Sequence, residues 1–166
     1  MGLVFPLEVE LFTSLAILIA LLTDQFSKFI IQSNFEYSQR IDLVGEFLGL
    51  RYINNNGVGF GLFSGLNPIT ISIIISVILF VLISFAIKYK KQIDGPIQFF
   101  IGMIIGGALG NLVDRIRFGY VVDFIELFKF PAIFNFSDSF IVVGVILLIL
   151  AILIKGKKSA SSTVSE

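Results

Sequence analysis

The stretch 69–87, "ITISIIISVILFVLISFAI", runs for nineteen residues without a charged side chain. An α-helix needs about twenty predominantly apolar residues to cross the hydrocarbon core of a bilayer. Asn67-Pro68 precedes this run and "KYKK" (88–91) follows it, and both are typical helix-boundary signals. The stretch therefore predicts a membrane-spanning helix.

Three further runs have the same apolar character. They cover residues 11–31, 97–113 and 139–154. The run at 97–113 follows Gly95-Pro96 and is rich in glycine, and the last run stops at "KGKK". We therefore predict an all-α membrane protein with four transmembrane helices.

The domain organisation follows from these runs. Residues 1–158 form a single integral membrane domain, and the polar tail 159–166, "SASSTVSE", is predicted to be disordered. The N-terminal segment carries Glu8 and Glu10 where a cleavable signal peptide has basic residues, and no A-x-A site follows the first run. We therefore expect the first span to be a permanent helix.

The composition supports a membrane protein and excludes several kinds of chemistry. Hydrophobic residues make up 56% of the 166 residues and charged residues 14%, against about 25% charged residues in average soluble domains. The mean hydropathy is +0.97. The chain has no Cys and no His, which excludes disulfides, thiol nucleophiles, imidazole bases and the usual zinc ligands. We expect no cofactor and no metal, and carboxylates are the acid–base groups that remain.

The charge pattern bears on orientation. Lys plus Arg is 12 and Asp plus Glu is 12, so net charge gives no reason to expect a nucleic-acid partner. Four spans place both termini on one side, together with lysines clustered at helix ends. These are Lys88, Lys90, Lys91, Lys155, Lys157 and Lys158. Basic residues on the other side are scattered, so we expect both termini in the cytoplasm.

Two connections then lie outside. Residues 33–66 contain strand-like alternation in "RIDLV" (40–44) and "LGLRYI" (48–53), before a glycine-rich segment. This pattern predicts a small sheet on the membrane surface. Residues 116–137 form a second, aromatic-rich outer connection.

The polar residues of the spans gather at one level. A charged side chain at a helix centre costs about 2.5–3.5 kcal/mol on insertion scales, so those present need a reason. In the four-span arrangement they lie at the outer helix ends and in the loop that follows. They are Asp24, Lys28, Asn111, Asp114, Arg115, Asp123 and Asp138.

Three of the polar motifs also have purely structural interpretations. Asp24 and Lys28 share a helix face four residues apart, as would a snorkelling lysine and its partner. In "GGALGNLVDR" (106–115) the glycines indicate close helix packing, and Asp114-Arg115 could be an interfacial ion pair. "NNNGVGF" (54–60) is typical of a turn. Asn111, one turn deeper than Asp114, is harder to explain by packing alone.

Asp123 and Asp138 are the candidates for chemistry. Separately, Asp123 can be a loop carboxylate and Asp138 a helix N-cap. Asp123, however, is flanked by Val121, Val122, Phe124 and Ile125, where desolvation would raise its pKa. If the two carboxyl groups meet they share a proton, so that one can activate a water while the other donates to a carbonyl oxygen. This is hydrolysis without His, Cys or metal.

Five ordered blocks between residues 11 and 154 carry a resemblance to a known family. The blocks are "TDQFSK" (23–28), "NNGVGF" (55–60), "GGALGNLVDR" (106–115), "GYVVDFI" (119–125) and "FPAIFNFSDS" (130–139). Together they resemble the lipoprotein signal peptidases, the type II signal peptidases of bacteria, which are four-helix membrane-embedded aspartyl proteases. The chain departs from the family pattern at Val58, Gly59, Phe130 and Ser137.

The resemblance implies a site, a substrate and a location. Asp123 and Asp138 correspond to the catalytic dyad. The residues that would position the substrate or support the dyad are Asp24, Lys28, Asn55, Gly57, Asn111, Asp114, Arg115 and Asn135. The implied reaction removes the signal peptide of a lipid-modified prolipoprotein, before the diacylglyceryl-cysteine. The implied setting is the bacterial inner membrane, with the outer sheet acting as a β-cradle over residues 33–66, membrane lipids as neighbours and a monomeric enzyme.

Membrane transport is a different class of function that the sequence allows. A small transporter or channel subunit could use Asp24, Asp114 and Asp138 as a proton or cation path. Such a path needs polar residues at several depths, whereas the inner halves of the first and third spans are almost wholly apolar. A purely structural membrane protein explains the glycines but not the gathered carboxylates.

Overall fold

The computed structural model describes residues 5–57, 67–89 and 91–163, and it contains four long helices. They are α1 (Phe5–Asn34), α2 (Pro68–Tyr89), α3 (Gly95–Phe118) and α4 (Phe136–Thr163). Each includes a segment long and apolar enough to cross a membrane. The prediction of four transmembrane helices is therefore confirmed.

All four helices extend beyond their predicted ends, and the extensions of α3 and α4 bear on the earlier predictions. α3 continues to Phe118, five residues past the predicted end at 113, and stops at Gly119, which has a φ of 80° and donates its N–H to the oxygen of Arg115. Asp114 and Arg115 therefore lie on the helix. α4 continues to Thr163, so the backbone of 159–163 is helical where we predicted a disordered tail. Residues 164–166 lie outside the described part of the chain.

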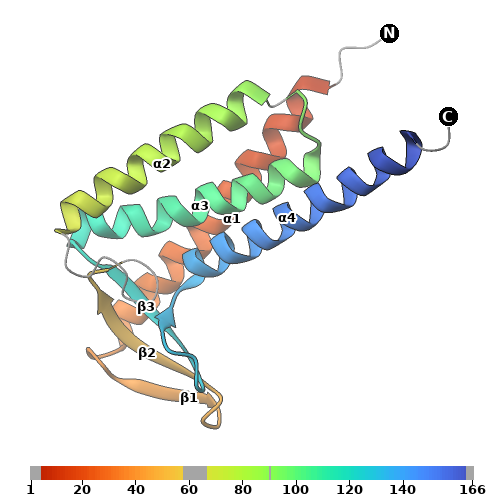
Figure 1. Cartoon of the computed structure of the whole chain (residues 1–166). Helices are drawn as coiled ribbons and strands as arrows, with labels where there is room; N and C mark the ends of the chain where they lie inside the picture. The colour runs from red at the N-terminus through yellow and green to blue at the C-terminus, as the bar shows by residue number, and fades with distance from the viewer. Residues whose placement is uncertain (1–4, 58–66, 90, 164–166) are drawn as a thin grey trace.

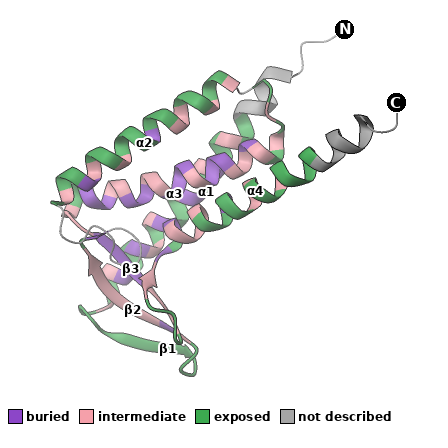
Figure 2. Ribbon diagram, viewed as in Figure 1, coloured by how far each residue is buried: buried purple, intermediate pink, exposed green. Residues whose placement is uncertain are grey.

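Helix α3 is the centre of the bundle and packs against each of the other three helices (Figure 1). Figure 2 shows buried and half-buried residues along its length, whereas much of α2 is exposed. Its glycines allow this proximity: a Cβ on Gly102 would lie 2.6 Å from the oxygen of Thr13 in α1, and one on Gly107 would lie 2.5 Å from the oxygen of Ser137 in α4. The glycine face thus sets the spacing of α1 and α4.

The sheet is antiparallel, and four strands follow one another in the order of the chain. They are β1 (Arg40–Val44), β2 (Leu48–Asn55), β3 (Val121–Leu127) and β4 (Ile133–Phe134). The two strands predicted within 33–66 are confirmed, and residues 58–66 of the predicted cradle lie outside the described residues.

The connection predicted at 116–137 joins α3 to α4, but the sheet is larger than the one predicted within 33–66, because this connection supplies β3 and β4 to it. The first four residues of β3, Val121–Phe124, are all buried. A strand buried on both faces lacks the alternation of apolar and polar residues by which strands are recognised.

The sheet lies at the end of the bundle opposite to the start of α1 and the end of α4 (Figure 1). Val122 and Phe124 of β3 form a buried cluster with Ile31, near the end of α1. The helix ends nearest the sheet and the central strands of the sheet therefore meet in one region, and the polar residues singled out in the sequence lie there.

Candidate active site

Asp123 lies in the middle of the sheet. It sits on β3 opposite Ile53 of β2, and only 2% of its surface is exposed. Asn55 Nδ2 donates to its Oδ2 at 2.7 Å, and Asn135 Nδ2 donates to its Oδ1 at 2.7 Å. The interpretation of Asp123 as a loop carboxylate is wrong, because a strand and two amide side chains fix its position.

Asp138 is the third residue of α4, so it is not the helix cap that the sequence allowed. The cap is Asn135, whose Oδ1 accepts the N–H of Asp138 at 2.9 Å. In return Asp138 Oδ2 accepts the N–H of Asn135 at 3.4 Å, a reciprocal arrangement known as a capping box. The remaining oxygen, Oδ1, accepts Asn111 Nδ2 at 2.8 Å.

Asn135 joins the two acids. Its side chain accepts from the backbone of Asp138 and donates to the carboxyl group of Asp123, as well as to Asn111 Oδ1 at 3.0 Å. Asp123 and Asp138 also line one cavity of about 230 Å³, together with Asn55, Asn111 and aliphatic side chains of α2, α3 and α4. Two acids fifteen positions apart in the chain thus face one enclosed space.

The environment of Asp123 disfavours its charged form. Burial raises its pKa to about 7 from an ordinary value of 3.8, and the negative charge of Asp138 adds to this effect. The hydrogen bonds from Asn55 and Asn135 and the positive charge of Lys28 act in the opposite direction. Near neutral pH this carboxyl group can therefore both hold and release a proton.

A buried ion cluster lies behind the dyad. Lys28 Nζ is 2.8 Å from Asp24 Oδ2 and 2.9 Å from Asp114 Oδ2, and it donates to Asn111 Oδ1 at 2.9 Å. Lys28 is only 2% exposed, so the interpretation as a snorkelling lysine is wrong. Asp24 and Asp114 are 0% and 1% exposed, and neither is among the residues that line the cavity.

Arg115 anchors the segment that follows β2. Its Nη2 donates to the oxygen of Gly57 at 2.7 Å and its Nη1 to the oxygen of Asn111 at 3.1 Å. The N–H of Gly57 donates to Asn55 Oδ1 at 2.8 Å. The ion pair between Asp114 and Arg115 that the sequence allowed is not found in the part of the chain that the structure describes: Asp114 pairs with Lys28, while Arg115 binds backbone oxygens. Arg115 and Gly57 thereby orient the Asn55 amide toward Asp123.

Gln25 is a site residue that sequence reasoning missed. Its Nε2 lies within 3.2 Å of Asp24 Oδ2, 3.0 Å of Asp114 Oδ1 and 3.2 Å of the oxygen of Gly110. The sequence could have indicated Gln25 as a site residue, since it stands between Asp24 and Lys28 in the block "TDQFSK".

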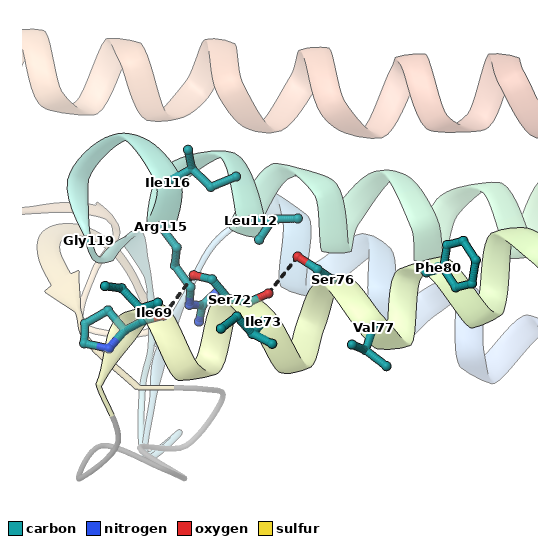
Figure 3. Close-up of a pocket in the computed structure, with 11 residues that line it drawn as sticks. Ile69, Ser72, Ile73, Ser76, Val77, Phe80, Leu112, Arg115, Ile116 and Gly119 are labelled. Atoms are coloured by element: carbon teal, nitrogen blue, oxygen red, sulfur yellow. Dashed lines mark hydrogen bonds between the residues drawn. The ribbon is translucent and has the colours of Figure 1, made fainter.

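A larger groove lies on the bundle surface between α2 and α3, but it contains neither catalytic candidate (Figure 3). Its volume is about 530 Å³, and aliphatic side chains and Arg115 line it together with Ser72 and Ser76. Both hydroxyls donate within their own helix, Ser72 to the oxygen of Pro68 and Ser76 to that of Ser72. The groove is thus an apolar face suited to lipid, and the smaller cavity is the candidate active site.

The donor set does not suggest a metal. Within residues 5–57, 67–89 and 91–163, no group of three or more carboxylates is placed to hold an ion. The space between Asp24 and Asp114 is occupied by the ammonium group of Lys28.

Known proteins resemble this chain in sequence and in fold. The model of the signal peptidase (SPase) II family matches residues 16–154. A lipoprotein signal peptidase of Halothermothrix orenii is 41% identical over 136 residues, which are 82% of this chain and 91% of that protein. A lipoprotein signal peptidase of Moorella thermoacetica is 39% identical over 131 residues, which are 79% of this chain and 85% of that protein.

Two solved structures support the same relationship. Both are of bacterial membrane enzymes, determined by the in meso method at 2.3 and 1.9 Å resolution. The first superposes with a TM-score of 0.78 at 32% identity, over 88% of this chain and 90% of the other. The second gives a TM-score of 0.74 at 33% identity, over 85% and 92%.

Proposed function

The chain belongs to the signal peptidase II family, and from this premise we propose that it is an aspartyl endopeptidase. Its reaction is the removal of the signal peptide from lipid-modified prolipoproteins, with cleavage before the diacylglyceryl-cysteine. The observation that carries the aspartyl mechanism is the hydrogen-bonded link between Asp123 and Asp138 through Asn135, at one cavity. The transporter hypothesis is set aside, because the family is one of peptidases.

The chemistry needs one proton shared between the two acids. The ionised carboxylate takes a proton from a water molecule, and the water oxygen attacks the scissile carbonyl carbon. The protonated carboxyl group donates to the carbonyl oxygen as negative charge develops there. The tetrahedral intermediate then collapses, a proton passes to the leaving amine, and the dyad again holds one proton. The raised pKa of Asp123 supports this cycle near neutral pH.

The lining of the cavity suits an apolar peptide. Ile75 and Leu79 of α2, Ala108 of α3 and Ile141 of α4 form its walls, and the polar groups gather around Asp123. A signal peptide would place its apolar side chains along these walls and its scissile bond at the polar end. Few waters would then compete with the reaction.

The lipid groups of the substrate have a second apolar place available. Phe124 and Phe136 meet edge to face, with ring centroids 5.8 Å apart, and line a groove of about 420 Å³ with Leu48 and Leu50 of the sheet. Neighbouring residues of a strand point to opposite faces, so this groove lies across β3 from Asp123. We place the acyl chains against this groove. Equal cleavage of a substrate with an unmodified cysteine would contradict lipid recognition.

The orientation is proposed to put the dyad near the outer surface of the bacterial inner membrane, with both termini cytoplasmic and the enzyme monomeric. The chain has no cysteine, so single cysteines report on sidedness without a background. Glu46→Cys in the turn between β1 and β2 should react with an impermeant maleimide in intact spheroplasts, and Lys91→Cys only after lysis. The reverse labelling would contradict this orientation.

The decisive experiment is cleavage of a lipidated prolipoprotein by the purified protein. Asp123→Asn and Asp138→Asn should each lower kcat by about a thousandfold or more, because each removes a proton-transfer group. Asp42→Asn is the matched control, since Asp42 is a surface carboxylate that pairs with Arg40. Thermal unfolding should show all three variants folded. Turnover within tenfold of wild type by either dyad variant would remove the dyad from the mechanism.

A further inference from the structure

We propose that Lys28 is the positioning residue of the dyad: it holds the two buried carboxylates that each bind the backbone N–H immediately before a catalytic aspartate. This inference rests on the proposed function. It concerns residues that lie behind the cavity and that touch neither substrate nor the reacting atoms.

The two carboxylates have equivalent roles on different elements. Asp24 Oδ1 accepts the N–H of Ser137 at 2.9 Å, and Ser137 directly precedes Asp138. Asp114 Oδ2 accepts the N–H of Val122 at 3.1 Å, and Val122 directly precedes Asp123. Each carboxylate therefore fixes the backbone on which one catalytic side chain is mounted.

Lys28 ties these two anchors together. Its ammonium group lies 2.8 Å from Asp24 and 2.9 Å from Asp114, so one cation of α1 pairs with carboxylates of both α1 and α3. All three groups are buried, and in such an environment a charge-assisted hydrogen bond is short and strong. Gln25 bridges the same two carboxylates from the neighbouring position. A displacement of Lys28 would thus be transmitted to β3 and to the start of α4 together.

A third contact of Lys28 fixes the amide beside Asp138. An ammonium group can only donate hydrogen bonds, so the side-chain oxygen of Asn111 must face Lys28. The amide nitrogen of Asn111 must then face Asp138, to which it donates at 2.8 Å. Lys28, together with the Asn135 amide that donates to the same oxygen at 3.0 Å, therefore fixes Asn111 as a donor to Asp138.

The sensitivity of the reaction to such positioning is large. Misplacing reacting groups by about 1 Å can cost about a hundredfold in rate. Because Lys28 touches no substrate in this arrangement, its loss should lower kcat while leaving KM nearly unchanged. The positive charge of Lys28 also lowers the pKa of Asp123. Removal of this charge alone should therefore move the alkaline limb of the pH–rate profile to higher pH. The other charges around the dyad are those of Asp24, Asp114 and Arg115.

The variant for the test keeps the charge of the cluster. Lys28→Met alone would leave two buried carboxylates unpaired and could prevent folding. Combining it with Asp24→Asn keeps one net negative charge in the cluster and keeps an oxygen that accepts the N–H of Ser137. The matched control is Lys155→Met with Asp94→Asn, which removes an exposed ion pair at 2.8 Å.

The assay is cleavage of the lipidated prolipoprotein, with kcat and KM measured separately across pH. We expect the Lys28→Met/Asp24→Asn variant to lose about thirtyfold to a hundredfold in kcat and to keep KM within about threefold. The control should match wild type. A folded variant with kcat within threefold of wild type would overturn the inference, as would a loss confined to KM.

A second comparison applies even if that variant does not fold. Asp114→Asn keeps an acceptor for the N–H of Val122, whereas Asp114→Leu has a similar volume and removes it. We expect the leucine variant to have a kcat at least about tenfold below that of the asparagine variant. Equal kcat values would overturn the inference. If the wild type is active and the variants keep its kcat, this inference alone is contradicted. If the wild type does not cleave the prolipoprotein, the proposed function on which the inference rests is contradicted.

Discussion

At the scale of single residues, the protonation of Asp123 depends on where β3 places it. The pKa of about 7 lies above the ordinary 3.8, chiefly because the group is buried and secondly because Asp138 is near. Ionisation is therefore less favourable in the folded protein than in the unfolded chain. A dyad that shares one proton loses it at high pH, so cleavage should decline once the pH rises above about 7.

The same shift predicts how stability depends on pH. Between about 4 and 7 the folded state retains a proton on Asp123 that the unfolded chain has released, so this group lowers stability as pH rises, by at most about 1.4 kcal/mol per pH unit. Asp123→Asn should remove this component. Unfolding midpoints in detergent at pH 5 and pH 8 check it for both proteins. An equal decline in the variant would assign the effect to other groups.

Ser137 gives a second prediction at this scale. Its hydroxyl oxygen is buried and has no hydrogen-bond partner among the described residues, while its backbone N–H is bound by Asp24. An unsatisfied buried hydroxyl costs about 1–3 kcal/mol. Ser137→Ala should therefore leave activity unchanged and raise the unfolding midpoint, as measured by a thermal shift assay. Ser139→Ala is the contrasting variant and should be destabilised, because the hydroxyl of Ser139 donates to the oxygen of Asn135.

The sequence made both dyad aspartates candidates, because acidic residues in apolar surroundings are costly and few. Their partners were only partly predictable. The resemblance implied Asn55, and its side chain does contact Asp123. Asn135 was expected at the site from the resemblance alone. Its role as helix cap and as bridge between the acids depends on the meeting of β3 and α4, which no local pattern specifies.

At the scale of elements, α3 determines the bundle through its glycines. A Cβ on Gly106 would lie 2.8 Å from Ala20 Cβ and 2.9 Å from Ile17 Cα, both on α1. Contacts this short require the two helices to separate. The sequence predicted this face from consecutive GxxxG steps, and it did so because small residues at that spacing have one common structural use in a membrane.

Gly106→Ala should therefore destabilise the protein by about 1–3 kcal/mol, the usual cost of overpacking. Gly156→Ala is the matched control, since a Cβ there meets nothing within 4 Å and alanine favours a helix. The measurement is thermal unfolding of both variants in the same detergent. If Gly106→Ala is as stable as Gly156→Ala, the close contact of α1 with α3 is not required.

Strand β3 marks the limit of what pattern reading can predict for an element. It is central in the sheet, between β2 and β4, and its first four residues are buried. Its sequence, VVDFIEL, does not alternate as that of an amphipathic strand does, and it is too short for a full span. The edge strand β1 is exposed throughout and was nevertheless easier to predict, because its residues alternate.

At the scale of the whole molecule, the two hollows beside α2 test where the substrate binds. Ala108 lines the cavity that contains the dyad, whereas Val77 lines the groove that faces lipid. Ala108→Phe should fill part of the 230 Å³ cavity and compete with the signal peptide, raising KM by about tenfold or more. Val77→Phe adds a similar volume to the outer groove and should leave cleavage unchanged.

The two variants differ only in which hollow they fill, so the comparison is direct. Both should insert in the membrane and unfold at temperatures near that of wild type, because each side chain enters existing space. Kinetics with a lipidated prolipoprotein at several concentrations separate KM from kcat. A raised KM for Val77→Phe with unchanged kinetics for Ala108→Phe would move the substrate to the outer groove. The dyad could then reach the scissile bond only if α2 moved, because both hollows share that helix as a wall.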